Sequence, residues 1–342
     1  NPYISDEELK IANLYKSFID RDKVNRLGYD PILPELKIIS EISNVIDLWQ
    51  YFSRSIKSGS SIPLRIFIYD DLKDPLNYTI YIDQGGLGLP DRDYYLEDNY
   101  KEIRSAYITH IENLLRLASI KNPKQKALSA FEIENELAKV QLSRLEMRDP
   151  ERIYNPYKKD RLYDLGGKYW NEWVEELGLE NQNKFIVESP VYITALINLM
   201  NEIPIDKWKD YLIVRLVKGS AGSLSDDFIQ ESFEFSKILT GREKLPDLWK
   251  RAVGLVNGIM GDALGKIYVN EFFPPEYKDK MEILVDNLLE SYRIGIQELE
   301  WMSDETKKRA LEKLSKMRVK IGYPEVWDDY EGLEINPDDL YG

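Results

Sequence analysis

The sequence predicts a mainly α, multi-helix domain with one small β-hairpin. Apolar residues recur at helical spacing over most of the 342 residues. A single region near residues 64–84 is instead rich in β-branched and aromatic side chains, which is typical of strands. Hydrophobic residues make up 43% of the chain and aromatic residues 12%, so a chain of this length can bury a sizeable core.

The first predicted element is an amphipathic helix over residues 6–19, with acidic residues in its opening turn, where the helix dipole favours them. Helical patterns follow over 34–46 and 45–55, and Pro31 and Pro34 mark the connection before them.

The hairpin is predicted from two strand-like runs at 64–69 and 78–82, joined by a turn at 74–77. Residues 85–90 contain three glycines and a proline, which excludes a regular element and predicts a tight backbone turn.

Helical periodicity then dominates to the end of the chain, interrupted at proline and glycine. The further predicted helices are 98–117, 124–147, 170–177, 189–202, 205–217, 226–240, 245–268, 274–301 and 303–319. Residues 148–156 carry two prolines and are expected to form an ordered loop, and a short apolar run lies at 185–187. Neither a repeat nor a low-complexity linker is evident, so a single domain over 1–342 is the simplest organisation.

Composition excludes several classes of function. The net charge of −14 disfavours nucleic acids and anionic membrane surfaces as partners. Cysteine is absent, which removes disulfides, thiolate zinc ligands and cysteine nucleophiles. No apolar run approaches the ~18 residues of a membrane span, and the N-terminus lacks a signal-peptide pattern, so a cytoplasmic location is favoured without being fixed.

The residues that could carry chemistry form no recognisable catalytic centre. His110 is the only histidine, and a zinc site, triad or proton relay needs further partners, so a hydrogen-bonded structural role is expected. Residues 218–223 lack the Gly-Lys-Ser/Thr ending of a phosphate-binding loop and predict a helix junction. The acid pairs 226–227, 328–329 and 338–339 match no calcium loop and predict helix caps or solvated surface.

Four glycines, Gly254, Gly258, Gly261 and Gly265, recur at steps of three and four. This spacing places them on one stripe of a single helix, where the missing side chains would let another helix approach closely. A dinucleotide fingerprint is excluded because no strand precedes them.

Several strings in combination resemble the neprilysin-type zinc metallopeptidases, which include the bacterial oligopeptidases of the PepO kind. Residues 87–95 are similar to the LGLP-x-RDYY signature of that family, and 81–84, 148–155 and 249–258 look like further family strings in the same order. Residues 301–310 and 321–324 are similar to the WM-xxx-TK-xx-A and IGYP strings, so the resemblance spans nearly the whole chain.

The parts of the family pattern that this sequence lacks matter as much as the strings that it shares. In that family the zinc is held by a His-Glu-x-x-His helix and by a glutamate of a Glu-x-x-x-Asp helix, both beyond the region matched here. No catalytic or metal-binding residue is carried over to any position, and the substrate-binding residues stay unknown. The resemblance therefore implies the family's helical substrate-gating domain, with 320–342 as the crossover towards a missing C-terminal catalytic zinc domain.

Three hypotheses follow from the sequence. In the first, the chain is the gating portion of a zinc metalloendopeptidase that hydrolyses short peptides, with zinc in the complete enzyme, none bound by this chain, and no activity of the chain alone. In the second, it is a stand-alone helical module that binds peptides or a partner protein. A large exposed apolar patch would favour the first over the second. The third, a novel carboxylate-metal enzyme, requires a tight metal site among acids.

Overall fold

The computed structural model describes residues 5–57, 59, 62–167 and 169–342. Backbone packing divides the chain into two compact units. Unit 1 combines Asn1–Asp20 with Pro246–Leu340, and unit 2 combines Arg21–Leu245 with Tyr341–Gly342. The single domain over 1–342 stays a prediction, because compactness alone does not decide whether the two units unfold together.

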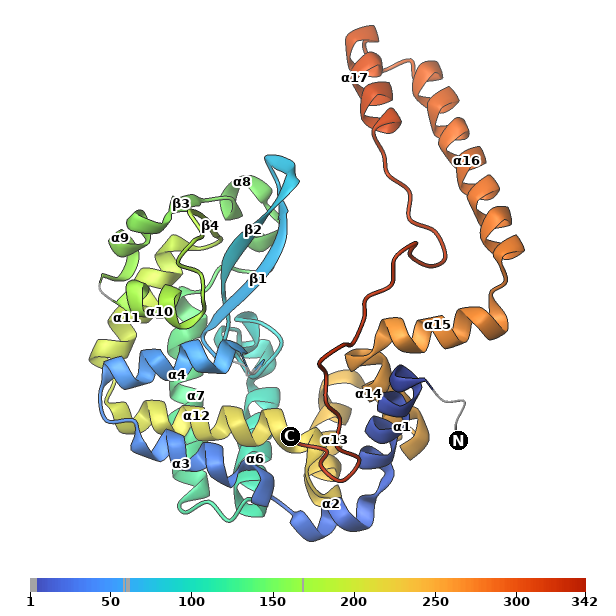
Figure 1. Cartoon of the computed structure of the whole chain (residues 1–342). Coiled ribbons are helices and arrows are strands. Elements are labelled where there is room, and N and C mark those ends of the chain that lie inside the picture. The colour runs from blue at the N-terminus through green and yellow to red at the C-terminus, as the bar shows by residue number, and fades with distance from the viewer. Residues whose placement is uncertain (1–4, 58, 60–61, 168) are drawn as a thin grey trace. The chain divides into compact units, whose positions relative to one another are not determined.

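Unit 2 is a helical body with a small sheet (Figure 1). Its helices are α2 (Arg21–Leu27), α3 (Leu33–Glu41), α4 (Val45–Lys57), α5 (Asp93–Leu96), α6 (Lys101–Leu117), α7 (Pro123–Val140), α8 (Pro150–Ile153), α9 (Tyr163–Gly166), α10 (Tyr169–Glu176), α11 (Pro190–Glu202), α12 (Ile205–Ser220) and α13 (Asp226–Thr240). Helices α6, α7 and α12 pack together around fully buried large side chains such as Tyr107, Leu137 and Tyr211. Burial of such apolar surface is the main stabilising term of the fold.

The sheet of unit 2 has the strand order β1-β2-β4-β3. Strands β1 (Leu64–Asp71) and β2 (Asp74–Gln84) are antiparallel, β2 runs parallel to β4 (Lys184–Val187), and β3 (Pro156–Lys158) is antiparallel to β4. The predicted hairpin is confirmed, but the predicted turn at 74–77 is wrong. The turn lies at 72–73, and 74–77 belong to β2, because the strands pair further towards the tip than their apolar runs extend.

Unit 1 consists of α1 (Asp6–Ile19), α14 (Leu248–Ile259), α15 (Gly261–Phe272), α16 (Pro275–Glu298) and α17 (Asp304–Ser315). Helix α1 has the predicted bounds, and Ser5 and Glu8 form the capping box that starts it. The core cluster of unit 1 is small, consisting of Leu14, Val256, Met260 and Ala263.

The single helix predicted over 245–268 is wrong, because it is broken at Met260 into α14 and α15. The backbone of Met260 leaves the helical region, with φ −125° and ψ 45°, between two glycines that weaken the helix. The four glycines therefore lie on two helices. An added Cβ would meet no atom of the described residues within 4 Å at Gly254, Gly258 or Gly261, whereas at Gly265 it would lie 3.1 Å from the Trp327 ring. The close approach of a side chain is therefore found at one of the four glycines.

Candidate functional site

The single histidine is bound inside unit 2. The His110 side chain is 3% exposed, lies 3.0 Å through Nδ1 from Oε1 of Glu231, and stacks on Phe235. Burial lowers the pKa of His110, and the hydrogen bond to Glu231 acts in the opposite direction. His110 thus joins α6 to α13 as a structural residue.

The other sequence candidates are also structural where the structure describes their contacts. Residues 218–223 end α12 and form a short 3-10 turn, as expected for a helix junction. Asp226 accepts hydrogen bonds from Arg21 and Asn25 at the start of α13. Among the described residues, no three His, Cys, Asp or Glu side chains gather closely enough to hold a metal ion.

The string at 87–95 forms a loop over residues 87–92 and the first residues of α5, and Tyr95 of α5 holds the loop in place. The Tyr95 hydroxyl accepts hydrogen bonds from the backbone N–H groups of Gly88 and Leu89, at 3.0 and 2.9 Å. The same hydroxyl donates to the buried carboxylate of Glu134 at 2.7 Å. The spacing within the signature therefore lets its tyrosine fold back and bind its own glycine turn.

Glu134 is the centre of a buried polar network beneath this loop. Its carboxylate also accepts from the Tyr107 hydroxyl at 3.0 Å and pairs with Arg215 at 3.4 Å. Lys218 donates to the carbonyl of Gly88 at 3.2 Å. Burial raises the pKa of Tyr95 and of Tyr107, so both hydroxyls stay protonated as donors. The network fixes the loop in position.

A pair of buried acids lies where β2 and β4 end. Asp83 is 4% exposed and Glu188 is 6% exposed, and the Arg65 guanidinium lies 3.4 Å from Oδ2 of Asp83. Burial, followed by the neighbouring charge of Asp83, raises the pKa of Glu188 to about 8. The single positive charge of Arg65 faces the carboxyl groups of both Asp83 and Glu188, so this pair of acids holds a proton near neutral pH.

Helix α16 of unit 1 carries exposed apolar side chains along one side. This helix has 24 residues and none of them is buried. One stripe along it, which we call the α16 stripe, is apolar and between 41 and 65% exposed; it consists of Tyr277, Met281, Leu284, Leu288 and Tyr292. Helix α17 also has no buried residue. Exposed apolar surface of this extent marks an interaction site.

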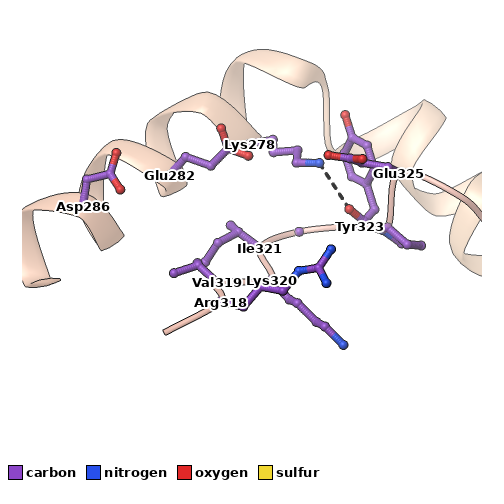
Figure 2. Close-up of a pocket in the computed structure, with 11 residues that line it drawn as sticks. Lys278, Glu282, Asp286, Arg318, Val319, Lys320, Ile321, Tyr323 and Glu325 are labelled. Carbon is purple, nitrogen blue, oxygen red and sulfur yellow. Dashed lines mark hydrogen bonds between the residues drawn. The ribbon is translucent and has the colours of Figure 1, made fainter. Parts of the chain in front are cut away.

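A groove of about 700 Å³ lies between α16 and the segment that follows α17 (Figure 2). Lys278, Glu282 and Asp286 of α16 form one wall, and residues 318–325 form the other. Lys278 donates to the carbonyl of Tyr323 at 3.2 Å and so links the walls. The groove carries three cationic and three acidic side chains, so its net charge is close to zero.

A model of the N-terminal region of peptidase family M13 matches residues 1–324 of this chain. The chain belongs to peptidase family M13. It is 28% identical to human neprilysin over 92% of this chain and 47% of that protein. It is 27% identical to the neutral endopeptidase of Lactobacillus helveticus over 98% of this chain and 53% of that protein.

Solved structures show the same relationship. The crystal structure of Mycobacterium tuberculosis zinc metalloprotease Zmp1 in complex with inhibitor is 34% identical, with a TM-score of 0.93 over 98% of this chain and 52% of that chain. Lactobacillus rhamnosis PepO, at 19% identity and a TM-score of 0.85, has the same fold. The chain spans about half the length of the curated relatives it matches. No helix in the described ranges is long and apolar enough to cross a membrane.

Sequence reasoning missed the α16 stripe and the groove as candidate interaction sites. The helix itself was predicted, over 274–301, and its periodic apolar residues were visible. Periodicity shows that a helix has an apolar face, but it does not show whether that face is covered.

Proposed function

We propose that this chain is the substrate-gating half of a neprilysin-like zinc metalloendopeptidase that hydrolyses short peptides. In this proposal the zinc ligands and the general base come from a second half, called the catalytic half here, which carries the His-Glu-x-x-His helix. Zinc would supply a bound water activated for attack on the peptide carbonyl. The role of this chain is to limit access to that centre by steric exclusion and to admit short, flexible peptides.

The observation that carries the proposal is the uncovered α16 stripe. A fold that is complete without a partner covers most of its large apolar side chains. The exposed stripe therefore favours a missing partner, and the length of the relatives, about twice that of this chain, supports a partner of similar size.

A two-part measurement tests this function. The purified chain alone is expected to contain no stoichiometric zinc and to leave internally quenched peptides uncleaved. Mixing it with the polypeptide that carries the His-Glu-x-x-His helix, encoded in the same reading frame or a neighbouring one, is expected to give zinc-dependent cleavage. Stoichiometric zinc and cleavage by the chain alone would overturn the proposal, and so would the absence of any such polypeptide.

Matched variants locate the contact. Leu284→Lys with Leu288→Lys should leave the chain folded, because these side chains are 47 and 50% exposed, but should weaken complementation at least tenfold. Val191→Lys in α11 of unit 2 is the control, because Val191 is 77% exposed and lies outside the stripe. Equal complementation by both proteins would show that the stripe is not the contact.

A further inference from the structure

The helix predicted over 303–319 is wrong in its last residues, because α17 ends at Ser315, and the segment that follows it has the alternation of a strand. Residues 317–321 alternate apolar and basic side chains, with Met317, Val319 and Ile321 at the apolar positions. Alternation with a period of two and β-branched residues favours a half-buried strand. Met317 is 55% exposed and Val319 is 40% exposed, so the apolar side of this strand is only partly covered.

The backbone of this segment is not paired. In the part of the chain that the structure describes, residues 317–321 lie in no helix or strand. After the turn that closes α17, the backbone groups of 318–321 make no hydrogen bond with other backbone groups of the described chain. Unpaired N–H and C=O groups along a strand are a template for the addition of another strand.

The groove beside this segment continues along α16 into a second cleft. Asp286 lines the groove and also a cleft of about 390 Å³ between α16 and α17, in which Leu311, Leu314 and Met317 contribute apolar surface. In Figure 2 Lys320 points away from α16, whereas the groove lies between the segment and the helix. The groove and the cleft are lined by residues of α16 other than those of the α16 stripe, so a partner that pairs with the segment would use this side of the helix.

We propose that residues 317–321 are a β-strand whose sheet is completed by the catalytic half, which adds an extended strand along the free backbone edge. This inference rests on the function proposed above. With Lys320 pointing away, two basic and three acidic side chains line the groove and leave a net charge of only about −1, so an uncharged or apolar strand fits it better than a strongly charged peptide. The family model matches as far as residue 324, and the relatives continue for about as many residues again, which supplies the chain needed for this strand.

Hydrogen exchange at single-residue resolution tests the strand. In the chain alone, amides of 318–321 are expected to exchange rapidly. In the active complex with the catalytic half, alternate amides are expected to slow by at least about tenfold, because only every second N–H of a strand faces a given neighbour. An active complex in which these amides remain fast would overturn the strand while leaving the proposed function intact.

Other outcomes are equally decisive. Failure of the two halves to associate by size exclusion would overturn the proposed function together with the strand. If the amides of 318–321 exchanged slowly in the chain alone, and more slowly at higher protein concentration, the free edge would pair with a second copy of this chain. This result would also overturn the proposal.

Backbone variants separate main-chain pairing from side-chain contacts. Proline removes the backbone donor, whereas alanine keeps it. Whatever each alanine variant loses through its side chain, we expect one of Lys320→Pro and Val319→Pro to lose at least about tenfold more complementation than the alanine variant at the same position. Circular dichroism of each variant alone should match the parent, because the segment lies outside every helix and strand of the described chain. Equal effects of proline and alanine at both positions would contradict main-chain pairing.

Discussion

Gly88 lies where a side chain has no room. A Cβ atom added there would lie 1.6 Å from the Tyr107 hydroxyl oxygen and 2.8 Å from Oε1 of Glu134. Both atoms belong to the buried network that holds the 87–95 loop, and displacing them would leave polar groups unsatisfied. This glycine is therefore required by the close approach of the loop to Glu134.

The substitution Gly88→Ala should lower the free energy of unfolding by about 1–3 kcal/mol through overpacking. Urea unfolding followed by circular dichroism measures the change. The matched control is Gly254→Ala, at an exposed position of α14 where an added Cβ meets nothing within 4 Å, and it should be stabilising by about 0.5–1 kcal/mol. Equal effects at the two glycines would contradict the crowding at Gly88.

The buried acids of unit 2 should make stability depend on pH. Glu188 has a pKa raised from 4.5 to about 8, so between these values the folded chain binds more protons than the unfolded chain. The stability gained from protonation is complete below pH 4.5 and is lost as the pH rises through about 8. Glu188→Gln should reduce this loss, as measured by urea midpoints across the range. Glu243→Gln, at an exposed position, is the control and should show the same change of stability with pH as the parent. If Glu188→Gln showed that same pH dependence too, Glu188 would not be its source.

At the scale of elements, local signals fixed some helices and not others. Helix α13 has the predicted bounds 226–240, because Ser225 precedes it and Gly241 takes the left-handed conformation, φ 69°, that ends it. The break at Met260 was missed because apolar periodicity continues across it. Strand β4 has four residues, too few for periodicity to reveal, and it becomes a strand by pairing with β2 and β3.

The candidate site shows the same limit. The strings at 87–95 and 321–324 placed the chain in its family, because side-chain identities at fixed spacing are visible in a sequence. The network beneath the loop joins Tyr95, Glu134 and Arg215 from three helices, and only the tertiary fold brings these residues together. The exposure of the α16 stripe also depends on tertiary packing, because it is decided by which other segments pack against the helix.

For the whole molecule, the difference in core size between the units has a consequence for unfolding. The core cluster of unit 1 has four buried residues, whereas that of unit 2 includes large side chains such as Trp49, Trp170 and Trp208. Buried apolar area sets much of the stability of a compact unit. Unit 1 should therefore be the less stable of the two when the chain is alone.

We expect the isolated chain to unfold in two steps in urea, with α14 losing its hydrogen-exchange protection at a lower concentration than α7. Addition of the catalytic half should raise the midpoint of α14 and leave that of α7 nearly unchanged, because a ligand stabilises the unit to which it binds. A single transition, with both helices losing protection together, would instead support the one cooperative domain over 1–342 that the sequence predicts. The apolar surface of α16 would then be carried by a body stable without a partner, and the stand-alone binding module would become the better account of the chain.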